Sequence, residues 1–269
     1  VALDVRLNDF RQVFKFPKAI GVGLAAQYLL FPVLTLCVVL AFRPPVSIGL
    51  GMVLIAACPS GNMTNFLVHF AKANIALSLT LNAMILLAAS VLTPLIFGFW
   101  GKYIPESAEI RQTFQISFLK MTAIILELIV VPLALGMWLN NRLPTLVEKH
   151  RKTVQRIAVV LFFAILVLAI AGNMEIVRNH LGHVFGLVAA QNFAALGLGY
   201  FLAKLFRLPE NDCRALAFET GVHNTALGLI LIFNFFGGLG GMALIAAWYG
   251  IWDLVSGYAL AAFWRNRTA

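Results

Sequence analysis

Charged residues are scarce in this chain of 269 residues, where Asp, Glu, Lys and Arg together make up 12% of the sequence. Soluble domains carry about twice that share. Hydrophobic residues reach 61%, and the mean hydropathy is +0.90. A chain with so few polar side chains cannot cover a water-soluble globule of this length. The composition therefore excludes an ordinary soluble domain and predicts an all-α membrane protein with several spans.

Cysteine is scarce as well, and its spacing matches no metal-binding or disulfide pattern. The three cysteines are Cys37, Cys58 and Cys213. We therefore predict neither a disulfide nor a transition-metal site. Ser60, Glu219 and His223 are residue types that enzymes use, but the chain has no GxSxG, HExxH or paired Asp motif. The sequence thus predicts that the protein is not an enzyme and has no organic cofactor.

Long apolar runs occupy most of the chain. Eight of them, each about 18–26 residues long, are separated by short polar stretches, and each is long enough to cross ~30 Å of hydrocarbon as a helix. The predicted spans cover residues 19–41, 47–70, 75–100, 114–139, 157–174, 184–206, 215–236 and 242–264. Residues 1–18, 101–111, 140–152 and 175–183 are predicted to lie in water.

The basic residues that give the chain its net charge of +9 lie mostly on one side of the membrane in this topology. With eight spans, fifteen of the 20 Lys and Arg residues fall on one side of the membrane and four on the other, and Lys120 lies within a span. Basic residues are enriched on the cytoplasmic side of membrane proteins. We therefore expect both termini in the cytoplasm, a lipid bilayer as the surroundings and no nucleic-acid partner.

Two polar clusters interrupt otherwise apolar segments. They are Cys58-Pro-Ser-Gly-Asn-Met-Thr-Asn65 and Glu219-Thr-Gly-Val-His-Asn224. Burying such groups in a membrane costs several kcal/mol unless each finds a partner. Either cluster alone is compatible with close helix packing through interhelical hydrogen bonds. Together with a carboxylate at mid-membrane, they predict two discontinuous helices that form a transporter binding site, in preference to a channel or a non-transporting membrane protein.

The positions of the clusters predict an internal repeat. The first cluster lies in the second span, so one full span precedes it and one follows it. The second cluster lies in the seventh span. In the second half of the chain, which starts at the fourth span, three full spans precede this cluster and one follows it. If the clusters are equivalent, two helices are missing at the start of the first repeat. An odd number of helices in each repeat makes the repeats inverted. We therefore expect a ten-helix inverted-repeat fold, of which this chain holds the last eight helices.

The two clusters, together with the segments Ala71-Lys-Ala-Asn-Ile-Ala-Leu-Ser78 and Ala26-Gln27 ahead of Pro32, resemble the bile acid:sodium symporter family. This family includes bacterial homologues of the apical sodium-dependent bile acid transporter, and the resemblance covers essentially the whole chain. It implies a core domain with two crossing helices, and a panel domain beside it that is only partly present. Residues 1–18 would be the cytoplasmic end of a missing helix and its loop, and residues 112–174 would be the remaining panel helices. The first core repeat would cover 19–100, with a break near 58–65. The second core repeat would cover 182–264, with a break near 219–224.

The resemblance also implies the function. We expect sodium-coupled symport of an organic anion, either bile acid-like or a small carboxylate, into the cytoplasm by alternating access. The expected setting is the bacterial inner membrane, with the protein either monomeric or a homodimer. Na⁺ is the one metal ion that the resemblance implies. The implied sodium ligands are Thr64, Asn65, Ser78, Asn82 and Glu219 in one site, and Gln27, Glu219, His223 and the backbone around Thr220 and Val222 in the other. The implied substrate-binding residues are Asn65, Asn192, His223 and Asn224.

His223 is the main departure from the family pattern, which usually has glutamine at this position. A neutral imidazole is a poorer sodium ligand than an amide oxygen, so the second sodium site is either lost, altered or replaced by proton coupling. Proton-coupled transport on the same scaffold is therefore the alternative function. Gln191 and Asn192 either hydrogen-bond across the core or reach the substrate crevice. The intramembrane Asp253 is likewise compatible with a structural role inside the core or with a functional one.

Overall fold

The computed structural model describes residues 15–61, 63–113, 118–172 and 174–267. Helices make up all of the regular elements in those ranges, apart from one isolated bridge between two residues. Five helical stretches of the described chain are long and apolar enough to cross a membrane: Pro17–Phe42, Ile75–Tyr103, Phe118–Arg142, Gly182–Leu205 and Gly240–Arg267. The prediction of a nearly all-helical membrane protein is therefore confirmed.

The first of these stretches is a helix with a widened turn. It consists of α2 (Pro17–Ala25), the π-helical turn η2 (Ala26–Leu30) and α3 (Phe31–Phe42). Pro32 has no N–H to donate into the preceding turn, which favours a local departure from α-helical hydrogen bonding. The wide turn contains the fully buried Gln27. Arg43 then takes a left-handed conformation (φ 45°) and ends the helix ahead of two prolines.

The next two helices form the first interrupted pair. α4 (Val46–Ala57) ends where Cys58 becomes extended (φ −71°, ψ 150°), because a residue that precedes proline is sterically disfavoured in the helical region. α5 (Met63–Phe70) continues beyond the break. α6 (Ile75–Trp100) then crosses the molecule after the side chain of Asn74 accepts a hydrogen bond from Leu77 N at 3.1 Å and caps it.

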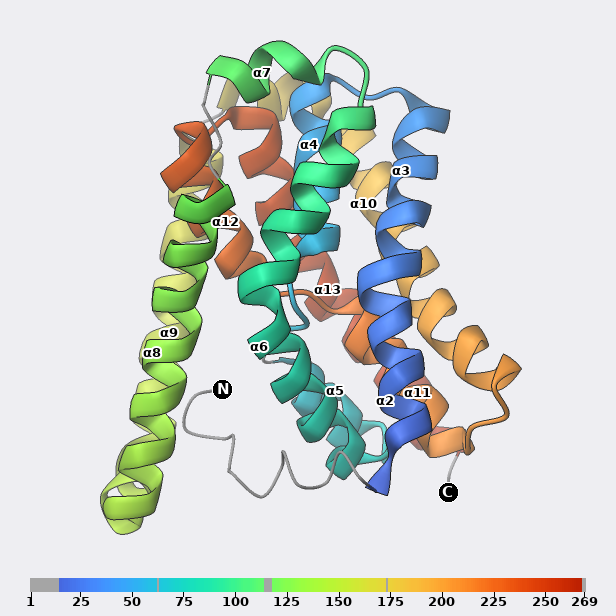
Figure 1. The fold of residues 1–269 in the computed structure, drawn as a ribbon, viewed down its shortest axis with the longest axis vertical. Helices are drawn as coiled ribbons and strands as arrows, with labels where there is room; N and C mark the ends of the chain where they lie inside the picture. Colours follow the sequence, from blue (N-terminus) through green and yellow to red (C-terminus); the bar gives the residue numbers. More distant parts are fainter. Residues whose placement is uncertain (1–14, 62, 114–117, 173, 268–269) are drawn as a thin grey trace.

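The second interrupted pair lies near the end of the chain. α11 (Glu210–Gly221) ends as Val222 becomes extended. Asn224 then caps α12 (Thr225–Phe236), since its side chain accepts from Leu227 N at 3.1 Å. The two pairs run in opposite senses. α4 and α12 occupy one end of the molecule, and α5 and α11 occupy the other (Figure 1).

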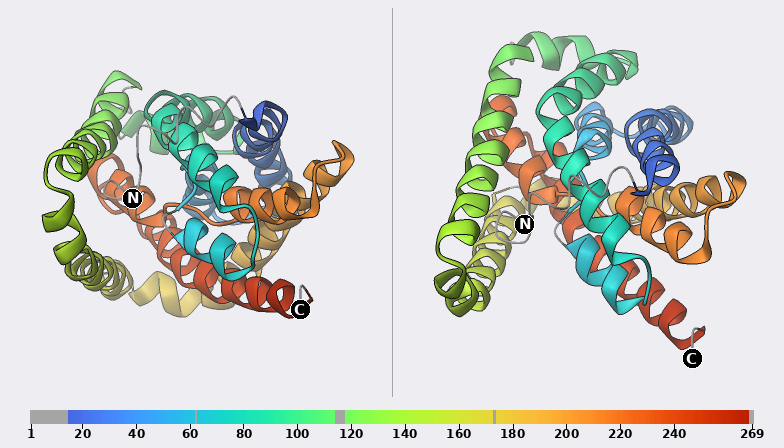
Figure 2. Two further views of the ribbon diagram at one scale, coloured as in Figure 1. Left: turned by 90° about the horizontal axis from the view of Figure 1, so that it is seen from below. Right: turned by 60° about the horizontal axis from the view of Figure 1, so that its bottom comes forward.

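α8 (Phe118–Arg142) and α9 (Pro144–Ala171) run side by side along one edge of the molecule (Figure 2). The sequence predicted a basic loop over 140–152 and an aqueous segment over 175–183. The loop prediction is wrong for most of its length, since α9 begins at Pro144, and the segment 175–183 is helical, since it lies in α10 (Met174–Leu205). Hydropathy detects where a helix leaves the hydrocarbon, and these two helices continue beyond that point. The predicted polar loop 101–111 likewise contains η3 (Gly101–Tyr103) and much of α7 (Ser107–Thr113).

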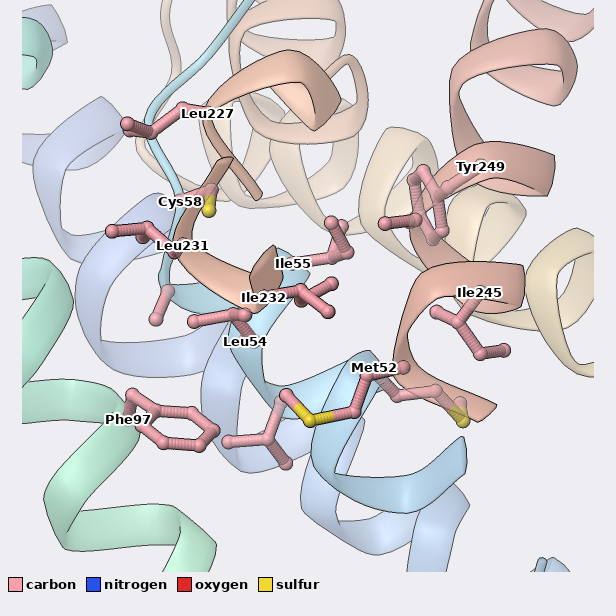
Figure 3. Close-up of a cluster of buried hydrophobic side chains, with 14 of the residues drawn as sticks. Met52, Leu54, Ile55, Cys58, Phe97, Leu227, Leu231, Ile232, Ile245 and Tyr249 are labelled. Atoms are coloured by element: carbon pink, nitrogen blue, oxygen red, sulfur yellow. The ribbon is translucent and has the colours of Figure 1, made fainter. Parts of the chain in front are cut away.

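α13 (Gly240–Arg267) is the long helix against which α4 and α12 pack. A Cβ atom at Gly51 of α4 would lie 2.9 Å from Met242 Cα, so the two backbones approach as closely as small residues allow. Large apolar side chains from α4, α6, α12 and α13 fill the space around this contact (Figure 3). They hold the second interrupted pair in place next to the first.

Candidate functional site

The two breaks are hydrogen-bonded to each other. Gly61 N donates to Val222 O at 3.0 Å and Asn224 N donates to Pro59 O at 2.8 Å, so that Ser60 and His223 form an antiparallel bridge. Interrupting a helix within a membrane leaves backbone groups without partners, and each such group costs several kcal/mol. The crossing supplies those partners by pairing one break with the other.

Gly61 is required for this approach. A Cβ atom at that position would lie 2.7 Å from His223 O, a distance that real Cβ atoms essentially never show. The obstructing atom belongs to the backbone of the other break, so it cannot move aside as the end of a side chain can. The glycine thus allows the crossing by leaving space for the second chain segment.

Glu219 lies in the last turn of α11, next to the crossing, and is 1% exposed. Its Oε1 accepts from Ser78 Oγ of α6 at 2.5 Å, and its Oε2 accepts from Ser60 Oγ of the first break at 2.7 Å. One carboxylate therefore joins both breaks and α6. A buried carboxylate of this kind is functional in membrane proteins by default.

Oxygen atoms outnumber hydrogen donors around Glu219. Ser78 Oγ also lies 2.8 Å from Asn65 Oδ1, although a hydroxyl has only one proton to share between the two acceptors. Asn82 Nδ2 donates to Ser60 Oγ at 3.0 Å, and Thr64 Oγ1 approaches Val222 O at 3.5 Å. Hard cations prefer carboxylate, amide, hydroxyl and carbonyl oxygens. The structure thus brings Thr64, Asn65, Ser78, Asn82 and Glu219 together in a setting whose chemistry suits a sodium ion.

The second predicted sodium site draws on Gln27 of η2 and on the second break. Gln27 Nε2 donates to Cys58 O at 2.9 Å, whereas Gln27 Oε1 and Thr220 Oγ1 are buried and make no hydrogen bond to any described residue. The Val222 carbonyl already accepts from Gly61 N and Thr64 Oγ1, so both of its lone pairs are engaged in this conformation. The free oxygens of Gln27 and Thr220 fit a cation better than the carbonyl of Val222.

His223 is held by packing. Its ring stacks on Phe31 with centroids 4.9 Å apart and meets the ring of Tyr249 edge-on at 5.5 Å. Neither ring nitrogen forms a hydrogen bond within the described residues, so no such bond links the imidazole to Glu219. The structure brings His223 to the crossing without connecting its side chain to the carboxylate.

The predicted substrate-binding residues differ in accessibility. Asn65 and Asn224 are half-buried at the two breaks, and Asn224 caps α12. Asn192 of α10 is fully buried, and its Nδ2 donates at 2.9 Å to both Gly221 O and Asp253 Oδ1. In this conformation Asn192 supports the second break from inside the core.

Two residues at the crossing were absent from the predicted site. Ser60 donates to Glu219, and Asp253 Oδ2 accepts from His223 N at 2.8 Å. The sequence contained a signal for each. Ser60 lies inside the first polar cluster, and Asp253 is a carboxylate within a predicted span, where charged residues are rare.

The chain is similar to sodium-dependent transporters along nearly all of its length. The profile of the Sodium Bile acid symporter family matches residues 1–180. "Probable sodium/metabolite cotransporter BASS2, chloroplastic" of Oryza sativa subsp. japonica is 28% identical over 270 residues, which cover 99% of this chain and 61% of that protein. "Uncharacterized sodium-dependent transporter YocS" of Bacillus subtilis (strain 168) is 26% identical over 268 residues, covering 99% and 80%. "Probable sodium/metabolite cotransporter BASS3, chloroplastic" of Arabidopsis thaliana is 27% identical over 274 residues, covering 99% and 60%. The chain thus spans about three fifths of the length of these two plant relatives.

Proposed function

Because the chain belongs to the Sodium Bile acid symporter family, we propose that it is a secondary active transporter that couples the inward movement of an organic anion to a sodium gradient. The family and the named relatives are transporters and not enzymes. The observation that carries the proposal is the contact of Glu219 with both Ser60 and Ser78, beside the crossing of the two interrupted helices. Half-helices that meet in the membrane interior bind ions and substrates in secondary transporters.

The proposed architecture is an eight-span part of a ten-helix inverted repeat. Residues 19–100 and 182–264 would be the two core repeats, and 112–174 would be the remaining part of a panel domain. The opposite senses of the two interrupted pairs support this division, because repeats related by an axis in the membrane plane run in opposite directions. Alternating access would then move the core relative to the panel, in a bacterial inner membrane with both chain ends on the cytoplasmic side.

The first sodium ion is proposed to bind between Glu219, Ser78, Asn65, Asn82 and Thr64, with Ser60 added to the set that the sequence predicted. The carboxylate supplies the charge, and the serine hydroxyls would turn their lone pairs toward the ion when it enters. Gln27 and Thr220 are proposed for the second predicted ion, supported by their buried and unbonded oxygens. His223 contributes less to this site because a neutral imidazole is a poorer sodium ligand than an oxygen. The carbonyl of Val222 contributes less because it already accepts two hydrogen bonds.

The proposed substrate is an organic anion, either bile acid-like or a small carboxylate. Helix N-termini carry unsatisfied N–H groups and a partial positive charge, which attract anionic groups. α12 begins at the crossing with Asn224, and Asn65 lies in the first turn of α5 on the other side of it. Asn65, Asn192, His223 and Asn224 are the residues proposed to contact the substrate, Asn192 only after a rearrangement that exposes it.

Uptake into proteoliposomes tests the proposal. A panel of labelled bile acids and small carboxylates is offered with an inward gradient of either sodium or choline, between about pH 5.5 and 8, the range in which histidine titrates. Uptake of at least one anion that requires sodium supports the proposal. Uptake that ignores sodium and follows the pH gradient would support proton coupling on the same scaffold instead.

A further inference from the structure

A second carboxylate is buried beside the second break. Asp253 lies in the middle of α13 and is 3% exposed. An isolated carboxylate in the interior of a membrane is strongly disfavoured unless a positive charge compensates for it. Within the described part of the chain, no Lys or Arg forms an ion pair with Asp253. A bound cation or a proton would compensate for this charge.

The contacts of Asp253 are separate from those of Glu219. Asp253 Oδ2 accepts from His223 N at 2.8 Å, and Oδ1 accepts from Asn192 Nδ2 at 2.9 Å, whereas Glu219 is held by Ser60 and Ser78. The two carboxylates share no hydrogen-bond donor. They hold the break from different sides, with Glu219 turned toward α6 and the first break, and Asp253 turned toward α10.

Two buried oxygens next to Asp253 make no hydrogen bond to any described residue. They are Asn192 Oδ1 and Tyr249 Oη, and both side chains are fully buried. Tyr249 precedes Asp253 by one helical turn and therefore lies on the same face of α13 (Figure 3 shows its place in the core). Buried polar atoms without partners are rare in native proteins and call for an explanation such as a bound water or ion.

The arrangement combines one negative charge with neutral oxygen donors. The carboxylate of Asp253, the amide oxygen of Asn192 and the phenolic oxygen of Tyr249 are all hard ligands, the kind that alkali cations prefer. One carboxylate neutralises one monovalent ion, which removes the penalty of the buried charge. A divalent ion would leave an excess positive charge, which no second acidic side chain among the described residues of this cluster balances.

We propose that Asp253, Asn192 and Tyr249 bind a sodium ion at a further site on the α13 side of the break, separate from the two sites proposed above. This inference rests on the proposed function and deepens it, because it identifies a second source of charge for sodium coupling. It also gives a role to the change at position 223. The imidazole of His223 packs between Phe31 and Tyr249 and offers no oxygen, while its backbone N–H holds Asp253 in position.

Equilibrium binding of ²²Na⁺ to the purified chain in nanodiscs tests this site. The unmodified chain is expected to bind one sodium ion more than Asp253→Asn does. Glu219→Gln is expected to lose the ion that Glu219 holds and to keep the ion at Asp253. Glu127→Gln, which removes an exposed carboxylate of α8, is the matched control and should bind as the unmodified chain does. Size-exclusion profiles verify that each variant is folded.

Tyr249→Phe provides a second test, because it removes one oxygen and preserves the packing. It is expected to weaken the sodium site at Asp253 about tenfold, the loss that corresponds to ~1.4 kcal/mol. Unchanged sodium binding in Asp253→Asn would overturn the inference. If Asp253→Asn fails to fold, unchanged binding in Tyr249→Phe would overturn it. A chain that keeps all of its bound sodium in Asp253→Asn and loses sodium in Glu219→Gln refutes the site at Asp253 and leaves the proposed function intact. A chain that binds no sodium refutes both.

Discussion

The hydroxyl of Ser60 lies 2.7 Å from Glu219 Oε2, and this contact connects the two interrupted helices across the interior of the molecule. Ser60 also accepts a hydrogen bond from Asn82 Nδ2 at 3.0 Å. The serine is thus the link between the first break, α6 and the buried carboxylate. Any ion held by Glu219 would depend on this alignment.

Replacing Ser60 with alanine should weaken sodium coupling. Ser60→Ala removes a donor to Glu219 and an acceptor for Asn82, and losing such a partner at a buried site costs about 1–3 kcal/mol. We expect the sodium concentration for half-maximal uptake to rise about tenfold or more. Ser90→Ala is the matched control, since the Ser90 hydroxyl donates within its own helix, to Leu87 O at 2.9 Å. Equal sodium dependence in the two variants would remove Ser60 from the site.

Replacing Gly61 should separate the two breaks. The added methyl group of Gly61→Ala would lie 2.7 Å from His223 O, so one backbone must shift. Overpacking of this kind costs about 1–3 kcal/mol. We expect a lower melting temperature and loss of sodium-dependent uptake. Gly98→Ala on α6, where a Cβ atom would meet nothing within 4 Å, should leave both measurements unchanged. Normal uptake by Gly61→Ala would show that the close crossing is dispensable.

Replacing His223 with glutamine should strengthen sodium dependence. The amide adds an oxygen ligand at the crossing, while the backbone N–H of residue 223 can still donate to Asp253. The lost stacking on Phe31 should cost about 0.5–1.5 kcal/mol of stability. The Hill coefficient and apparent affinity for sodium in uptake are the readouts, with the exposed His69→Gln as the control. An unchanged sodium response would indicate that position 223 contacts no ion.

Replacing Asn74 should loosen the end of the core at which α6 and α11 begin. Asn74 caps α6 by accepting from Leu77 N, donates from Nδ2 to Asp212 Oδ1 at 2.7 Å, and donates from its backbone N to Asn211 O at 3.2 Å. Asn74→Ala loses the cap and the side-chain link, which should lower the free energy of unfolding by about 1–2 kcal/mol. Thermal unfolding measures this, with Asn234→Ala, an exposed side chain that bonds within its own helix, as the control. Equal melting temperatures would contradict the role given to the cap.

The sequence was sufficient to predict a helical membrane protein and to locate the polar clusters at which both interrupted helices break. Pro59 and Gly61 weaken the first helix locally, and the polar run after Glu219 does the same for the second. The contacts of Ser60 and Asp253 were not predictable, because they join residues on different helices, and no local pattern specifies which oxygen meets which. The lengths of α9 and α10 were missed for another reason. Charged residues mark the end of the hydrocarbon, and a helix stabilised by its own backbone hydrogen bonds can continue into water.

Glu219 is the residue on which sodium coupling depends in this account. Its effect is measured most directly by the melting temperature of the purified chain in increasing sodium, with choline at equal ionic strength as the reference. Ligand binding to the folded state at ten or more times its dissociation constant should stabilise it by about 1.4 kcal/mol or more, a rise of a few degrees. We predict this rise for the unmodified chain and for Glu127→Gln, and a clearly smaller one for Glu219→Gln. An equal rise in Glu219→Gln would contradict the account.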